Sequence, residues 1–99
     1  MTKEEKKALY DILAPAYVKA YKRDEAFYHL GKETGVYLEF EDEAADSALE
    51  KALNYLFPNM DIVGALCEFA SKDEVVLMSK DCTVSTYTDL EGIWNVYTE

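Results

Sequence analysis

A stretch of thirteen residues, LEFEDEAADSALE at positions 38–50, holds six carboxylates and no basic residue. Carboxylates at this density can ligate a hard cation, work in pairs in glycoside hydrolysis, or attract a cationic protein. The stretch lacks the glycine and the alternating aspartates of a calcium loop, and a 99-residue chain is small for a glycosidase. We therefore expect a protein-binding surface made of Glu39, Glu41, Asp42, Glu43, Asp46 and Glu50.

Other residue types that could do chemistry form no recognisable motif. His29 is the single histidine, and no Gly-x-Ser-x-Gly turn is present to supply a nucleophile. Cys67 and Cys82 are too isolated in sequence from each other and from His29 to predict a zinc site. Gly31 and Gly35 do not make a phosphate- or dinucleotide-binding loop. We predict a protein that is not an enzyme and has no catalytic residue, metal or cofactor.

The acidic stretch spans two expected elements. Residues 35–42, GVYLEFED, alternate apolar and polar side chains, which predicts a short, half-buried strand. Residues 42–57 predict a helix that Pro58 ends, with an apolar stripe made of Ala45, Leu49, Ala52, Leu53 and Leu56. We expect Asp42, Glu43, Asp46 and Glu50 to lie opposite this stripe. In this set, the carboxylates of Asp42, Asp46 and Glu50 are successively one helical turn apart.

Residues 3–30 predict an N-terminal helix with Thr2 as its cap. Pro15 interrupts the pattern, so it either kinks one long helix or separates two helices near Leu13. On one continuous helix, a single stripe would contain Tyr10, Tyr17, Tyr21 and Tyr28. Such rings usually lie at the boundary of the core, but exposed tyrosines are frequent in interfaces, so we take Tyr17, Tyr21 and Tyr28 as a candidate secondary contact.

The last third of the chain changes character. A further helix is expected from about residue 61 to residue 70, capped by Asn59 or Asp61. Three segments rich in Val, Ile, Thr and Tyr then follow at 74–79, 82–88 and 93–99, separated by turn-like residues. They predict a three-stranded antiparallel sheet. Residues 1–99 are thus expected to form one α+β domain, with N-terminal helices interrupted at Pro15, two further helices and this C-terminal sheet.

Charge is distributed unevenly along the chain. The net charge is −10 and the isoelectric point about 4.4. Residues 1–32 carry seven bases and five acids, whereas residues 33–99 carry three bases and fifteen acids. This excess of acids disfavours direct binding to nucleic acid or to an anionic membrane, and it favours a basic protein as the partner.

Two features bear on the compartment in which the protein works. No apolar run is long enough for a transmembrane helix or for the core of a signal peptide. Two isolated cysteines without a CxxC motif are typical of a reducing environment. We expect a cytoplasmic protein in which Cys67 and Cys82 do not pair.

In charge and size alone, the chain resembles the small acidic inhibitors of phages and mobile elements, such as nucleic-acid mimics, and the immunity proteins of toxins. Carboxylates one helical turn apart, ~5–6 Å, roughly match the spacing of phosphates along a nucleic-acid strand. The first hypothesis is a non-catalytic inhibitor or decoy that docks on the nucleic-acid-binding surface of a basic protein, such as a nuclease.

Three alternatives remain open at this point. The protein could be an immunity protein that neutralises a basic toxin nuclease by the same attraction. It could be a homodimeric scaffold that uses the tyrosine stripe or the last strand, whose Trp94 and Tyr97 would point to opposite faces. In that case the acidity would serve only solubility, as it also would if the acids form a solvated helix face. The third alternative, ranked last, is a small enzyme that uses carboxylates, one of which would have a raised pKa in a cleft.

Overall fold

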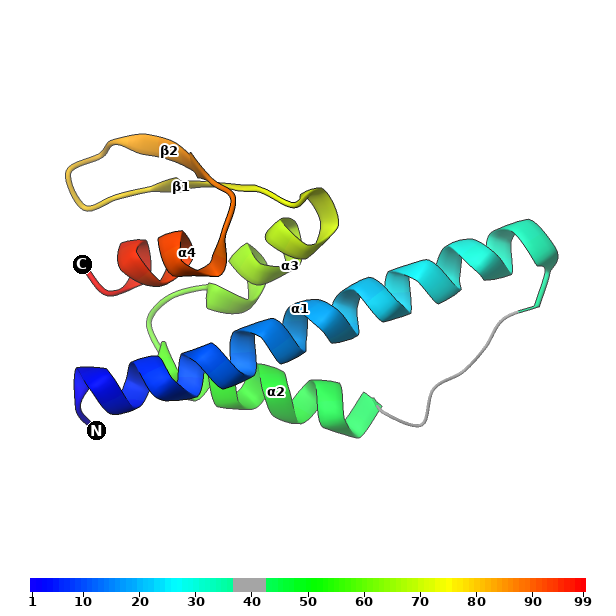
Figure 1. Ribbon diagram of the computed structural model, residues 1–99, viewed down its shortest axis with the longest axis horizontal. Helices are drawn as coiled ribbons and strands as arrows, with labels where there is room; N and C mark the ends of the chain where they lie inside the picture. The colour runs from blue at the N-terminus through cyan, green and yellow to red at the C-terminus, as the bar shows by residue number, and fades with distance from the viewer. Residues whose placement is uncertain (37–42) are drawn as a thin grey trace.

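One long helix, α1, runs through the molecule, and the other elements lie on two sides of it (Figure 1). The computed structural model describes residues 1–36 and 43–99. Helix α2 packs along one side of α1, while α3, a β-hairpin and α4 lie on the other (Figure 1). In chain order the described elements are α1 (Lys3–Thr34), α2 (Glu43–Leu56), α3 (Ile62–Lys72), β1 (Val75–Met78), β2 (Val84–Tyr87) and α4 (Leu90–Tyr97).

The core forms where these two groups of elements meet α1. A capping box starts α1, because the Thr2 hydroxyl accepts the Glu5 N–H and the Glu5 carboxylate accepts the Thr2 N–H. The buried residues of its first half recur at helical spacing and are Tyr10, Ala14, Tyr17 and Val18. They pack with apolar residues of the other elements, chiefly Leu53, Phe57, Ile62, Leu66, Val75, Ile93 and Trp94. The second half of α1 extends past α2 and α3 (Figure 1).

Helix α1 is one helix through Pro15, so of the two expected alternatives the division into two helices near Leu13 is wrong. Proline lacks the N–H that would bond to the Asp11 carbonyl, and this loss normally costs a helix about 3 kcal/mol. Pro15 itself is exposed, whereas the adjacent Ala14 is completely buried and Tyr17 is nearly so. Packing on the buried side therefore holds the helix together where its own hydrogen bonding is incomplete.

The sheet has two strands among the described residues, so the predicted three-stranded sheet is wrong. Most of the third predicted strand, residues 93–99, belongs to helix α4. The Asp89 carboxylate caps this helix by accepting the Gly92 N–H at 2.6 Å. An alanine Cβ at Gly92 would lie 2.6 Å from the Tyr87 ring, so the close approach of α4 to the hairpin depends on this glycine. Helical spacing then brings one face of α4 to the core, made of Leu90, Ile93, Trp94 and Tyr97.

The hairpin has one covered and one uncovered face. Val75 pairs with Tyr87 and Met78 with Val84 in an antiparallel register. Val75 is almost fully buried against the helices, whereas the alternate positions Val76, Met78 and Val84 are each more than half exposed. Side chains alternate between the faces of a strand, so these three lie together on the outer face of the sheet.

The two middle helices lie close to their predicted positions. The helix expected over 42–57 is observed as Glu43–Leu56, and the one expected over about 61–70 as Ile62–Lys72, capped by Asp61. The predicted strand at 35–42 falls mainly on residues outside the described ranges. In residues 1–36 and 43–99, no helix combines the length and the apolar character needed to cross a membrane.

Replacing Pro15 by alanine tests how much the proline costs α1. Pro15→Ala restores an N–H for the Asp11 carbonyl at an exposed position. We expect the free energy of unfolding in urea to rise by about 1–3 kcal/mol. Lys19→Ala, one turn further along the exposed side, serves as the control and should change stability by less than about 0.5 kcal/mol. Equal or lower stability of Pro15→Ala would contradict this account of the helix.

Candidate functional site

Two of the six acids predicted as a contact surface have described side chains. Glu39, Glu41 and Asp42 lie outside the described residues, and Glu43 is described only as the first residue of α2. An Asp46 oxygen lies 3.5 Å from the Arg23 guanidinium, and Glu50 accepts the Tyr17 hydroxyl at 3.1 Å. Both carboxylates therefore reach from α2 toward α1.

This orientation corrects the expected position of Asp46 and Glu50. The sequence pattern places them opposite the apolar stripe of α2, yet both contact the helix on which that stripe packs. At 3.6 residues per turn, Asp46 and Glu50 lie about one turn apart, and Leu53 lies about one turn beyond Glu50. Both acids therefore share a side of α2 with Leu53, which is fully buried. Asp46 and Glu50 thus lie at the edge of the contact between α1 and α2, and each contacts a residue of α1 in the same molecule.

A short polar chain crosses the contact between three helices. The Tyr17 hydroxyl of α1 lies 3.0 Å from the Cys67 sulfur of α3 and 3.1 Å from the Glu50 carboxylate of α2. A carboxylate only accepts hydrogen bonds, so Tyr17 donates to Glu50 and its oxygen is left to accept the Cys67 thiol. Burial, and next the Cys67 contact, raise the pKa of Tyr17 well above its usual range. The protonated hydroxyl thus donates a hydrogen bond that joins α1 to α2.

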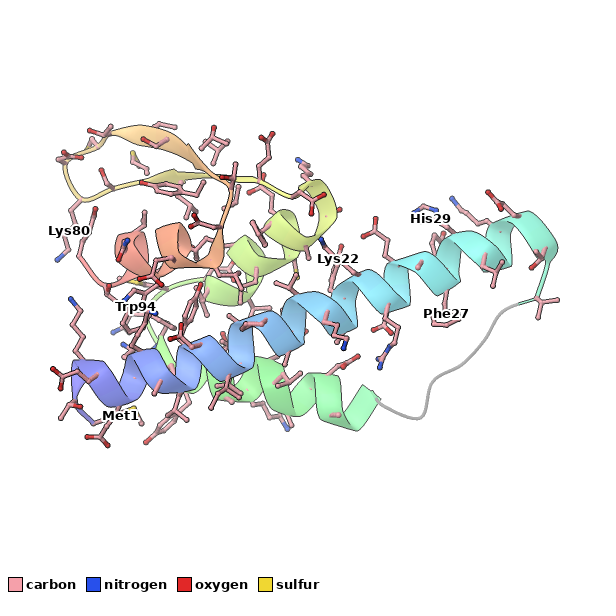
Figure 2. All side chains as sticks on the ribbon, viewed as in Figure 1. Met1, Lys22, Phe27, His29, Lys80 and Trp94 are labelled. Carbon is pink, nitrogen blue, oxygen red and sulfur yellow. The ribbon has the colours of Figure 1, made fainter. Side chains whose placement is uncertain are left out.

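Basic residues of α1 pair with acids of the elements around it. Lys7 contacts Asp11 and Glu91 at 2.8 Å each, which ties α1 to α4, and these hydrogen bonds, Asp11 first, raise the pKa of Lys7. Lys22 reaches upward from α1 in Figure 2 and contacts Asp73, just after α3, at 2.7 Å.

Arg23 completes this set of pairs toward α2. It contacts Asp24 at 3.1 Å on its own helix and Asp46 on α2. Pairs at exposed positions contribute little stability one by one, about 0–1 kcal/mol each. Together the three cations Lys7, Lys22 and Arg23 connect α1 to α2, to the end of α3 and to α4. Part of the charge difference between residues 1–32 and residues 33–99 thus forms contacts that hold the helices together.

The tyrosine row passes from core to surface along α1. Tyr10 is buried, its ring packs against Phe57 and Trp94, and its hydroxyl donates to the Leu90 carbonyl at 2.7 Å. Tyr17 is buried as well and Tyr21 is half-buried. Tyr28 is exposed, with the Lys32 ammonium over its ring at 5.1 Å. Of the three tyrosines named as a secondary contact, only Tyr28 thus offers its ring to a partner.

The remaining candidates for chemistry do not assemble into a site. His29 is exposed and lies 3.8 Å from Glu25 on the same helix (Figure 2). Cys67 is half-buried and Cys82 is exposed in the hairpin turn, and both are free thiols. Within residues 1–36 and 43–99, no three His, Cys, Asp or Glu side chains are grouped in a way that could hold a metal ion.

A pocket of about 340 Å³ lies beside the hairpin, and sequence reasoning missed it. Its apolar lining consists of Met60, Leu77, Met78, Val96 and Tyr97, which come from three separate segments of the chain. Volumes of ~300 Å³ and above are typical of pockets that hold a small ligand or a partner's side chain. Val96 and Tyr97 reach the pocket because this segment is helical, so predicting a strand there concealed the site.

No protein-family model, curated protein or solved structure matches the chain. The function therefore has to be inferred from the contacts, charges and pocket described above.

The polar chain at Tyr17 gives a prediction about stability. Tyr17→Phe removes the donor to Glu50 and the acceptor for Cys67 but keeps the buried ring. We expect the free energy of unfolding in urea to fall by about 1 kcal/mol. Tyr55→Phe, at a position that is 77% exposed, is the matched control and should leave stability unchanged. Equal stability of both variants would show that the chain of hydrogen bonds contributes nothing.

Buried tyrosines also predict a loss of stability at alkaline pH. Burial is the first cause that raises the pKa values of Tyr10, Tyr17 and Tyr97 in the folded protein. The Tyr97 hydroxyl, for example, donates to the Asp61 carbonyl at 3.2 Å. Above pH ~10 the unfolded chain ionises its tyrosines while these three stay protonated in the fold. Stability is therefore fully present below pH ~10 and falls as the pH rises toward the folded pKa values.

The measurement is an alkaline titration followed by tyrosinate absorbance and far-ultraviolet circular dichroism together. We expect part of the absorbance change to coincide with the loss of helical signal, because the buried hydroxyls ionise only when the chain unfolds. Complete ionisation of all eight tyrosines in a fully folded protein would contradict the burial of these hydroxyls.

Proposed function

We propose that the protein is a non-catalytic acidic inhibitor that docks on the basic nucleic-acid-binding surface of another protein. The observation that carries this proposal is how the charge is arranged around α1. Lys7, Lys22 and Arg23 are held by acids of α2, α4 and the end of α3, while the whole chain keeps a net charge of −10. The internal pairs occupy cations, and the excess of acids is left to face solvent.

Such a surface suits a cationic partner on physical grounds. Opposite charge accelerates association and makes it sensitive to salt, because ions screen the attraction over about 10 Å at 0.1 M. A groove that binds phosphates attracts such a surface and is then blocked to nucleic acid.

The contacts within the molecule divide the acids proposed for docking. Asp46 and Glu50 are engaged with Arg23 and Tyr17, so reversing their charge would disturb the contact between α1 and α2. Weaker binding by a variant of Asp46 or Glu50 would then not distinguish a lost docking contact from a disturbed fold. We therefore assign the docking role first to Glu39, Glu41, Asp42 and Glu43, which precede or begin α2.

The test starts with capture of partners from a lysate at low salt and elution with a salt gradient. The captured protein is then purified, and its binding to a labelled oligonucleotide is measured with increasing amounts of the acidic protein. We expect a basic nucleic-acid-binding protein that loses its oligonucleotide as the acidic protein is added. A captured protein that keeps its oligonucleotide, or no partner released by salt, would overturn the proposal.

Two matched triple variants then locate the contact. One variant carries Glu39→Gln, Glu41→Gln and Asp42→Asn. The other carries Glu4→Gln on α1, Glu68→Gln on α3 and Glu74→Gln just before β1. Each removes three negative charges from the same net charge of −10. We expect the first triple to weaken binding to the captured partner about tenfold at low salt and the second about two- to threefold. Equal weakening would attribute the attraction to net charge and remove residues 39–42 as the contact.

A further inference from the structure

We propose that the pocket beside the hairpin receives an aromatic side chain of the basic partner, one that the partner otherwise stacks against nucleic-acid bases. The basic character of this partner rests on the function proposed above, whereas the pocket and its surroundings are independent observations. The pocket lies on the other side of α1 from α2 (Figure 1), so the inference concerns a second surface, which receives an apolar group of the partner.

The pocket is apolar inside and open to solvent. Leu77 and Val96 are half-buried, while Met60 and Met78 are 45% and 63% exposed. Methionine is unbranched and polarizable, so it adapts to inserted side chains and makes favourable contacts with aromatic rings. A volume of about 340 Å³ gives room for a large aromatic side chain.

Hydrogen bonds hold two of the walls in place before anything binds. The Lys80 N–H donates to the Glu99 carboxylate at 2.9 Å, which joins the hairpin to the segment after α4. The Tyr97 hydroxyl donates to the Asp61 carbonyl, which joins α4 to the start of α3. These contacts bring the backbone segments around the pocket together before anything binds, so less of the chain has to be ordered when the pocket is filled.

The apolar surface continues from the pocket onto the hairpin. Met78 lines the pocket and pairs directly with Val84 on the outer face of the sheet. Val84 and Val76 are both more than half exposed. An exposed apolar patch on the outer face of the hairpin thus adjoins the pocket at Met78, and it offers a partner further apolar area next to an aromatic anchor.

In the described part of the chain, the lining of the pocket holds one acid and one base, and two further carboxylates lie next to lining residues in the chain, an excess that favours a basic partner. Glu99 lines the pocket, Asp61 adjoins Met60 in the chain, and Asp81 adjoins Lys80. Hydrogen bonds, first from the Ser79 hydroxyl and then from Thr83, lower the pKa of Asp81, so this carboxylate stays ionised. Among the described residues that line the pocket, Lys80 is the one base (labelled in Figure 2).

The chemistry of the proposed target matches this pocket. Surfaces that bind single-stranded nucleic acid combine a cationic groove for the backbone with exposed aromatic side chains on which bases stack. An apolar pocket with an acidic rim is complementary to such an aromatic side chain among lysines and arginines. A partner without exposed aromatic side chains would leave the pocket empty.

The test uses a short peptide with one central tryptophan and lysines on both sides, and a control peptide with serine in place of the tryptophan. Binding to the isotope-labelled protein is followed by nuclear magnetic resonance. We expect the tryptophan peptide to shift the amide signals of Leu77, Met78 and Val96 and to bind about tenfold tighter than the control. Equal affinities, or shifts confined to other elements, would overturn the inference.

Three variants sharpen this result. Met78→Ser should remove most of the tryptophan advantage, while Ile12→Ser, at an equally exposed site on α1, should keep it. Lys80→Gln should strengthen binding of both peptides about two- to threefold, because it removes a base of the pocket lining that repels them. An unchanged tryptophan advantage in Met78→Ser would exclude the pocket.

The outcomes separate the pocket from the proposed function. If both peptides bind equally and are released by salt, the protein attracts basic partners without using the pocket, so the inference fails while the function stands. If the tryptophan peptide binds in the pocket but the captured partner keeps its oligonucleotide, the proposed function fails while the pocket remains a binding site for an aromatic anchor.

Discussion

The burial of Tyr10 is the constraint on which the rest of the structure depends. Its side chain is almost completely buried, and its ring packs against Phe57 after α2 and against Trp94 on α4. Its hydroxyl bonds to the Leu90 carbonyl near the start of α4. One residue near the start of the chain thus fixes the positions of two elements that follow much later. The position of α4 in turn sets one wall of the pocket.

The sequence predicts this fold well where a local pattern is strong and poorly where two patterns compete. Apolar spacing predicts helices α2 and α3, and residues that favour sheets predict both strands of the hairpin. Residues 93–99 are also rich in such side chains, but the Asp89 cap and the spacing of Ile93, Trp94 and Tyr97 favour a helix. The combination of cap and spacing is visible in the sequence, and in the folded chain it outweighs composition.

The candidate site is harder to foresee than the fold. Counting charges identifies an acidic stretch, but it cannot show that Asp46 meets Arg23 or that Glu50 accepts a hydrogen bond from Tyr17, because those partners lie on another helix. The pocket is beyond sequence reasoning for the same reason, since Met60, Met78 and Val96 are separated in the chain. Periodicity describes one element at a time, whereas sites form between elements.

The charge pairs along α1 have a consequence for how this protein can change during evolution. The pairs of Lys7 with Glu91 and of Lys22 with Asp73 each contribute little stability alone, so the connection between the helices depends on keeping the set and not any one pair. Acids such as Glu4 and Glu74, which are exposed on the surface, carry no such restriction. Selection by a changing partner can therefore act on these acids while the pairs that connect the helices persist, so the surface can diverge faster than the fold that presents it.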